Sequence, residues 1–349
     1  MVYKYGIMGY ASNNIGDEIQ TLAQMRFLPH VEYICVREQL KQFKSSGNEK
    51  VKLIMNAWYM KNAANFPPSP DIMPLPISMH FNPKIYKAGF LGKPEVREWL
   101  IANGPVGARD RLTHKRLKNA GIPSYFSGDL TLTLLPNRKL KENNNHKYVL
   151  AFDLMEQEIS SLKNRTSLPV YCFKKKLYGA SMHNRLRLAR CVLALYQNAH
   201  VVVTRNLHAA LPSLALGTPV LLLSQQNGKF AGRFYGLYNL CNNMTSAEFI
   251  NNAKPYDMDT PPPNPERHRK MAAKLTAACT DFTGYDSMKS PIDGDFDPLF
   301  ELMSLMEFSD KQFRRNLYYA STKQLFHTLF DRLILSNDKY RMVDDRQIK

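Results

Sequence analysis

A short polar segment in the second half of the chain has the residue types of an active site. Thr204, Arg205, Asn206 and His208 directly follow the apolar run 201–203. The imidazole of a histidine titrates near neutral pH, and the guanidinium of an arginine binds carboxylate or phosphate. The run 201–203 is typical of a strand buried on both faces, and ligands of open α/β sheets bind at the carboxyl ends of strands. We therefore expect this segment to lie where such a fold performs its chemistry.

A second arginine occupies a similar position in the first half of the chain. Arg109 and Asp110 follow a short predicted strand at 106–108, and Asp129 follows another at 122–126. A guanidinium at a strand end suits a carboxylate or phosphate ligand. The alternative is an Arg109–Asp110 or Arg109–Asp129 ion pair that only holds the loop.

The first turn of the chain contains a third group of polar residues. A predicted strand at 2–9 leads into Asn14, Gly16, Asp17 and Glu18, and the two carboxylates open a helix, where they complement its dipole. The G-x-G-x-x-G pattern of dinucleotide-binding turns is absent. One interpretation is a plain helix cap, and the other places Asn14, Gly16 and Asp17 against a ligand at the domain edge.

A glycine-rich loop over 224–237 supplies two further cations, Lys229 and Arg233. Such a loop can grip an anion, and it can equally be an ordinary surface loop. Between residues 66 and 83 the prolines exclude a central helix, so we predict a loop followed by a short strand. His80 lies near the end of that strand, and a structural role is favoured over a catalytic one.

The elements that would position these residues follow from the spacing of apolar side chains. Leu186, Ala189 and Val192 recur at helical spacing before the strand at 201–203. The next helix stops at Gly217 and leads to a buried strand at 220–223. We expect further strands at 2–9, 33–36, 51–58, 148–153 and 170–173, and further helices at 93–102, 112–120, 266–281, 299–306 and 310–335.

The chain of 349 residues suits more than one domain. The charged, asparagine-rich segment 139–147 has the composition of a linker. We therefore predict an N-terminal α/β domain over 1–140, a second α/β domain containing His208 over 147–255, and helices with a polar tail over 264–349.

The formal net charge of +17 indicates anionic partners, such as phosphorylated substrates, anionic glycans, a membrane surface or nucleic acid. No basic tail makes nucleic acid the first choice. No apolar run reaches 18 residues and no signal peptide is evident, so we expect a cytoplasmic protein, with peripheral contact to an anionic membrane left open. The five scattered cysteines favour reduced thiols. No cluster of metal ligands is evident, and no oligomeric state is predicted.

Four ordered blocks resemble the polysaccharide pyruvyl transferase family. Asn14-Ile-Gly-Asp-Glu18 is similar to the family's N-x-G-D-E turn, and Gly107-Ala-Arg-Asp110 with Thr113 is similar to its R-D block. Ser127-Gly-Asp129 resembles the segment with the aspartate that ends the first domain in this family. Residues 204–220 resemble the block around the family's catalytic histidine, and the four blocks together lie within about residues 1–255.

The resemblance implies a GT-B-like arrangement of two Rossmann-like domains, here with a C-terminal helical extension. It implies transfer of pyruvate from phosphoenolpyruvate to hydroxyls of a carbohydrate acceptor, with no other cofactor and no metal. His208 matches the catalytic histidine and would be the general acid or base. Arg109 would hold the donor, Asp17 would orient or deprotonate the sugar hydroxyl, and Asn14, Gly16, Glu18 and Asp129 would line the cleft.

One position departs from the family pattern. Many members have arginine two residues before the histidine, where this chain has Asn206, with Arg205 one residue earlier. Arg205, Arg233 and Lys229 are the candidates to replace that cation at the donor. Two other hypotheses follow from the departure. One is a GT-B-like glycosyltransferase that uses a nucleotide sugar, and the other is a non-catalytic protein that binds an anionic ligand.

Overall fold

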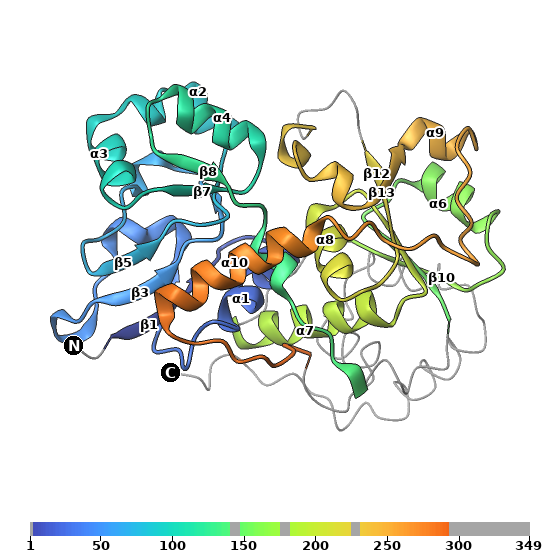
Figure 1. Cartoon of the computed structure of the whole chain (residues 1–349), viewed down its shortest axis with the longest axis horizontal. Coiled ribbons are helices and arrows are strands. Elements are labelled where there is room, and N and C mark those ends of the chain that lie inside the picture. Colours follow the sequence, from blue (N-terminus) through green and yellow to red (C-terminus); the bar gives the residue numbers. More distant parts are fainter. Residues whose placement is uncertain (1–2, 140–146, 175–181, 225–230, 293–349) are drawn as a thin grey trace.

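The protein is built around two parallel β-sheets with helices packed against them, as the computed structural model shows (Figure 1). The structure describes residues 3–139, 147–174, 182–224 and 231–292. The predicted α/β class is confirmed. The helices expected at 299–306 and 310–335 lie outside the described residues, as does most of the predicted linker.

The first sheet has the strand order β2-β1-β3-β5. Its strands are β1 (Lys4–Gly9), β2 (Tyr33–Val36), β3 (Val51–Ile54) and β5 (Ile72–Leu75), all parallel. Strand β2 has the predicted bounds. Strand β3 is shorter than the predicted 51–58, because the chain leaves the ladder after Ile54 and continues into a separate short strand.

Two short parallel pairs lie beside the first sheet. Strand β4 (Trp58–Tyr59) pairs with β6 (His80–Phe81), and β7 (Val106–Ala108) pairs with β8 (Ser124–Phe126). A bridge between Met79 and Ala108 joins the two pairs. Arg109 therefore leaves β7 next to the segment that carries His80.

Strand β5 was not predicted, since its sequence contains Pro74. Proline cannot donate a ladder hydrogen bond, so it is confined to sheet edges. In the described sheet β5 pairs with β3 alone and forms the edge, and Pro74 lies opposite Leu53. The edge position explains why a proline is tolerated in this strand.

The second sheet has the strand order β10-β9-β11-β12-β13. Its parallel strands are β9 (Val149–Phe152), β10 (Val170–Phe173), β11 (Val201–Thr204), β12 (Val220–Ser224) and β13 (Asn242–Thr245). The run 201–203 is fully buried in the central strand β11, as its composition predicted.

Helices cover both sheets and meet between them. On the first half lie α1 (Ile15–Met25), α2 (Pro83–Lys87), α3 (Pro94–Ala102) and α4 (Arg111–Asn119). On the second lie α6 (Glu156–Lys163), α7 (Met182–Asn198), α8 (Leu207–Ala215) and α9 (Ser246–Ile250). Ile19 and Leu22 of α1 belong to the same buried apolar cluster as Val192 of α7 and Leu211 of α8. The two halves therefore share a continuous core.

A long helix, α10 (His268–Thr283), runs from the second half back across the first (Figure 1). Lys52 Nζ of β3 donates to the Phe282 carbonyl over 2.7 Å. Just beyond the helix, Asp286 forms an ion pair with Arg26 Nη2 at 2.7 Å. The expected helix at 266–281 is thus present, and its carboxyl end packs on the N-terminal half.

Candidate active site

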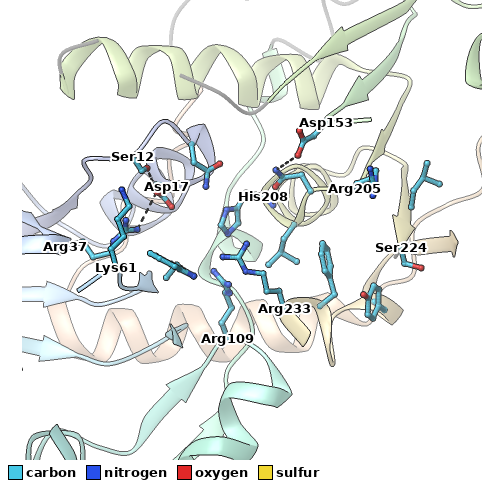
Figure 2. Close-up of a pocket in the computed structure, with 17 residues that line it drawn as sticks. Ser12, Asp17, Arg37, Lys61, Arg109, Asp153, Arg205, His208, Ser224 and Arg233 are labelled. Atoms are coloured by element: carbon cyan, nitrogen blue, oxygen red, sulfur yellow. Dashed lines mark hydrogen bonds and ion pairs between the residues drawn. The ribbon is translucent and has the colours of Figure 1, made fainter. Parts of the chain in front are cut away.

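A cavity of about 550 Å³ lies between the two halves and is lined by residues that follow strands of both sheets (Figure 2). Residues from the turn after β1, the ends of β7, β9, β11 and β12, and the segment 233–238 contribute to its walls. Among the described residues, the charged groups of this lining are mostly cations: Arg37, Lys61, Arg109, Arg205 and Arg233, against Asp17 and Asp153. The cavity therefore suits an anionic ligand.

His208 lies near the middle of the cavity on the first turn of α8 (Figure 2). The side chain of Asn206 caps this helix by accepting from the His208 backbone N–H over 2.9 Å. His208 Nε2 lies 3.3 Å from Asp129 Oδ2, and the carboxylate acceptor indicates a proton on Nε2. Among the described residues, none forms a hydrogen bond with Nδ1. One ring nitrogen is therefore anchored by Asp129, and the other forms no hydrogen bond with a described residue.

The N-terminus of α1 approaches His208 from the first half. Asn14 caps α1 by accepting from the Gly16 backbone N–H over 3.4 Å. A β-carbon on Gly16 would lie only 2.4 Å from His208 Nδ1, so the contact requires glycine. Two helices capped by asparagine thus direct their N-termini toward the same cavity. The partial positive charge of helix N-termini favours an anion there.

Asp129 lies behind His208 and does not belong to the cavity lining. Its Oδ1 accepts from the Thr131 backbone N–H at 2.9 Å and from the Thr131 hydroxyl at 2.7 Å. Burial alone would raise the pKa of Asp129. The hydrogen bond and charge of His208, with the charge of Arg109, instead hold that pKa below its usual range. Asp129 is therefore ionised at neutral pH and orients the imidazole.

Arg109 and Arg233 converge just below His208 (Figure 2). Arg109 is 2% exposed, and its Nε has no hydrogen-bond partner in the described part of the chain. Arg109 forms a long ion pair with Asp129, whose Oδ2 lies 3.9 Å from that nitrogen. Burial, followed by the charge of Arg109, lowers the pKa of Arg233 to about 10. The charge of Arg109 thus disfavours the charged form of Arg233, and an anion bound beside both arginines would relieve this repulsion.

Asp17 lies at the end of the cavity nearest the first sheet. Its Oδ2 accepts from the Ser12 hydroxyl at 2.5 Å and pairs with Arg37 Nη1 at 3.5 Å. Arg37 is 1% exposed, and its guanidinium is stacked between the rings of Tyr10 and Trp58 at 4.9 and 5.0 Å. This packing fixes the orientation of the Asp17 carboxylate.

The opposite end of the cavity carries Arg205, with Ser224 beyond it (Figure 2). Arg205 Nε lies 3.5 Å from Glu158 Oε1, so a buried carboxylate already partners this cation. Asn206 Nδ2 donates to Asp153 Oδ2 over 3.4 Å. Arg205 and Asn206 therefore line the cavity, but Arg109 and Arg233 are the arginines that converge on His208.

Glu18 does not belong to the cavity lining, in contrast to its neighbour Asp17. Consecutive residues of a helix point about 100° apart, so the Glu18 side chain faces α7. There Arg185 Nε donates to Glu18 Oε1 over 2.7 Å. Arg185 Nη2 also donates to the Ser12 carbonyl over 2.7 Å. The assignment of Glu18 to the cleft is therefore corrected: it joins α1 to α7.

The acidity of Glu18 predicts a pH dependence of stability. Burial, opposed by Arg185, raises the pKa of Glu18 from 4.5 to about 7. Between these values the folded chain binds more protons than the unfolded chain, so the contribution of Glu18 to the free energy of unfolding falls as pH rises. The limiting slope is about 1.4 kcal/mol per pH unit. In urea denaturation at pH 5 to 8, the free energy of unfolding of the wild type relative to that of Glu18→Gln should fall as pH rises, and the comparison cancels the contributions of other titrating groups such as His80.

The exposed Glu95 provides a matched control for the same change of charge. Glu95→Gln should retain the pH dependence of the wild type. Parallel curves for the wild type and Glu18→Gln would contradict the raised pKa of Glu18.

Of two further residues considered from the sequence, one lies outside the described residues and the other lies away from the cavity. Lys229 lies outside the described residues. His80 is buried against Asp110, as the structural interpretation expected, and does not belong to the cavity lining.

Several lining residues were not among the sequence candidates, and a common signal marks two of them. Arg37 directly follows β2, and Asp153 directly follows β9. The same rule that selected Arg109, namely a functional side chain at the carboxyl end of a parallel strand, would have selected them.

Within the described ranges, no group of three or more His, Cys, Asp or Glu side chains could hold a metal ion. The five cysteines are buried and unpaired. No helix among the described residues is long and apolar enough to cross a bilayer.

Three solved structures share low sequence identity with this chain. A functionally uncharacterised protein from Klebsiella pneumoniae subsp. pneumoniae has 15% identity and a TM-score of 0.45, covering 70% of this chain and 93% of its own. The UDP-GlcNAc 2-epimerase of Methanocaldococcus jannaschii has 10% identity and a TM-score of 0.35, covering 83% and 96%. The wall teichoic acid polymerase TagF has 9% identity and a TM-score of 0.39, covering 95% and 89%.

A search of curated proteins finds no match to the chain. The sequence model of the polysaccharide pyruvyl transferase family matches residues 14–227, which is more than half of the 349 residues. The match begins at the α1 cap and extends through the block around His208, so it includes both helix N-termini of the cavity. The chain therefore belongs to the polysaccharide pyruvyl transferase family, and it is a glycan-modifying transferase.

Proposed function

We propose that the protein transfers a pyruvyl group from phosphoenolpyruvate to two hydroxyls of one sugar in a glycan or glycolipid precursor. The observation that carries the proposal is the convergence of Arg109 and Arg233 beside His208. Phosphoenolpyruvate presents a carboxylate and a phosphate close together, so its recognition needs paired cations. A buried guanidinium nitrogen of Arg109 without a hydrogen bond, and a second arginine whose pKa is lowered by burial and then by the charge of Arg109, fit that requirement.

The reaction balances as follows. The methylene carbon of phosphoenolpyruvate takes one proton and becomes a methyl group. A sugar hydroxyl adds to the neighbouring carbon and loses its proton, and the bond from that carbon to the phosphate oxygen breaks. A second hydroxyl adds at the same carbon and loses its proton, giving the ketal. Of the two hydroxyl protons released, one replaces the proton taken by the methylene carbon and the other leaves with inorganic phosphate.

His208 is the proposed proton carrier. Asp129 holds the ring through Nε2, so the role of Asp129 is to orient the imidazole and stabilise its charged form. Nδ1 is then the nitrogen that exchanges a proton with the donor or the leaving phosphate. Arg233 takes the place of the arginine that Asn206 replaces in the family pattern, because Arg233 and not Arg205 accompanies Arg109 below the ring.

Asp17 is the proposed base or orienting group for the acceptor hydroxyl. It occupies the end of the cavity with Ser12, Arg37 and Trp58, a mixture of polar groups and an aromatic ring that suits a sugar. The acceptor would then approach the donor from the first sheet. We also infer that each sheet with its helices acts as one Rossmann-like domain, in a GT-B-like arrangement around the cavity.

Calorimetric titration with phosphoenolpyruvate tests the donor site without knowledge of the acceptor. Arg109→Ala should weaken binding by about 10- to 100-fold, since hydrogen bonds to charged groups contribute roughly 1.5–3 kcal/mol. Arg109→Lys should recover only part of the loss, because an ammonium cannot form a bidentate contact. Arg269→Ala, which removes an exposed arginine of α10, should bind as the wild type does.

Parallel titrations with uridine and guanosine diphosphates give the contrary outcome. Tight binding of a nucleotide, with none of phosphoenolpyruvate, would replace the proposal with a glycosyltransferase that uses a nucleotide sugar. Binding of phosphoenolpyruvate that Arg109→Ala leaves unchanged would remove Arg109 from the donor site.

A further inference from the structure

His80 is a buried histidine in contact with the loop that carries Arg109. It lies on β6 and is 1% exposed. His80 Nδ1 lies 2.5 Å from Asp110 Oδ2, and the carboxylate acceptor places the proton on Nδ1. The Thr113 hydroxyl lies 3.3 Å from the same nitrogen. His80 therefore donates a hydrogen bond to a buried cluster. Asp110 of this cluster is the sequence neighbour of Arg109, the proposed ligand of phosphoenolpyruvate.

Asp110 is fully engaged within that cluster. Its Oδ1 caps α4 by accepting from the Thr113 backbone N–H over 2.8 Å, and its Oδ2 accepts from the Thr113 hydroxyl over 3.1 Å as well as from His80. Asp110 is completely buried. Both carboxylate oxygens therefore have partners on the side of α4 and β6, and none of these partners is Arg109.

The backbone of Arg109 is fixed, while its guanidinium forms the long ion pair with Asp129 considered from the sequence, and its Nε donates no hydrogen bond to a described residue. The Arg109 backbone N–H donates to the Met79 carbonyl over 2.9 Å. Met79 thus binds the backbone of Arg109, and its neighbour His80 binds the side chain of Asp110. The Arg109–Asp110 ion pair considered from the sequence is not among the ion pairs of the described residues. The charges of the two side chains nevertheless act on each other, because the charge of Arg109 helps to lower the pKa of Asp110.

We propose that His80 is a positioning residue that keeps Asp110 engaged and so leaves the Arg109 guanidinium available to the anionic donor. The inference rests on the proposed role of Arg109 in donor binding. Without His80, the Oδ2 atom of Asp110 would retain only the Thr113 hydroxyl as a hydrogen-bond donor in a fully buried site. A buried carboxylate that loses a donor recruits another, and Arg109 is the cation next to it.

The protonation state of His80 agrees with this role. Burial, followed by the charge of Arg109, lowers the pKa of His80 from 6.5 to about 4, although Asp110 opposes the shift. Arg233 contributes in the same direction as Arg109. At neutral pH His80 is therefore uncharged, so it satisfies Asp110 without adding a third cation beside the two arginines.

The test is a set of calorimetric titrations of the full chain with phosphoenolpyruvate, with the melting temperature measured for each variant. His80→Ala should weaken binding by about 10-fold or more. His80→Asn, whose amide nitrogen replaces Nδ1, should bind within about threefold of the wild type. The double variant His80→Ala with Asp110→Asn should also recover most of the affinity, because asparagine still caps α4 but carries no charge to capture Arg109.

If His80 only stabilised the fold, a second substitution in the core would weaken binding further. Recovery of affinity in the double variant would therefore show that His80 acts by positioning. His114→Ala is the matched control. His114 lies on α4, the helix that Asp110 caps, and contacts the Ser124 carbonyl away from the cavity. His114→Ala should bind as the wild type does. Wild-type affinity in folded His80→Ala, or a double variant as weak as His80→Ala, would overturn the proposal.

The same series titrated with inorganic phosphate separates this inference from the proposed function. If the wild type binds phosphate but not phosphoenolpyruvate, the donor assignment fails, and the phosphate series alone decides the role of His80. If the wild type binds neither, Arg109 does not serve an anion and both proposals fail.

Discussion

Replacing His208 by alanine is expected to lower the rate of phosphate release from phosphoenolpyruvate by about 10²- to 10⁴-fold, the range typical of a lost general acid or base. The expectation follows from the geometry of the ring. Asp129 holds Nε2 at 3.3 Å, while no described residue forms a hydrogen bond with Nδ1, so the ring is oriented with one nitrogen left for the reaction. Release is measured by a phosphate assay over a panel of p-nitrophenyl hexosides as acceptors.

Two further variants identify the cause of the loss. His208→Gln retains a polar side chain that can contact Asp129 but cannot exchange a proton at neutral pH, so it should be as inactive as His208→Ala. His200→Ala removes a histidine that bonds the Asp259 carbonyl away from the cavity, and it should be fully active. Undiminished phosphate release by folded His208→Ala would exclude this residue from the chemistry.

Gly16→Ala should be nearly as damaging, with a fall of about 10²-fold or more in the same assay. The added methyl group would lie 2.4 Å from His208 Nδ1 and 2.9 Å from its Cβ. To accept it, either the imidazole must rotate away from Asp129 or α1 must move away from α8. A rotation removes the orienting hydrogen bond, and a movement opens the cavity between the two halves. Overpacking of this kind also costs about 1–3 kcal/mol of stability.

Gly92→Ala is the matched control for Gly16→Ala. A β-carbon on Gly92 meets nothing within 4 Å, so this change should leave activity and melting temperature as in the wild type. Calorimetry with phosphoenolpyruvate then separates the two routes of damage, because rotation of the ring spares donor binding whereas movement of α1 does not. A fully active Gly16→Ala would show that contact with α1 does not fix His208.

The sequence was sufficient to find the parts of the site that follow directly from local pattern. His208, Arg109 and Asp17 were selected because each follows a predicted strand, and the structure brings them to one cavity. The rule works because the carboxyl ends of parallel strands meet at one edge of a sheet, whatever the detailed packing.

The remaining features depend on packing that no local pattern specifies. Asp17 and Glu18 are neighbours with the same charge, yet one lies on the cavity and the other on α7, because consecutive helical residues point in directions about 100° apart. The pairing of Asp129 with His208 joins residues from different halves of the chain, so only the docked halves create it. Strand β5 was missed because its proline-containing segment was assigned to a loop, although a strand at a sheet edge tolerates proline.

The path of α10 has a consequence for synthesis on the ribosome. The carbonyl bound by Lys52 and the carboxylate bound by Arg26 both belong to residues 282–286, near the end of the described chain. At translation rates of about 5–20 residues per second, the first sheet waits roughly 10–40 s for these partners. During that interval the guanidinium of Arg26 lacks Asp286, its partly buried counter-ion. The N-terminal sheet therefore reaches its final state only after the second sheet has been made, so the two halves mature together rather than one after the other.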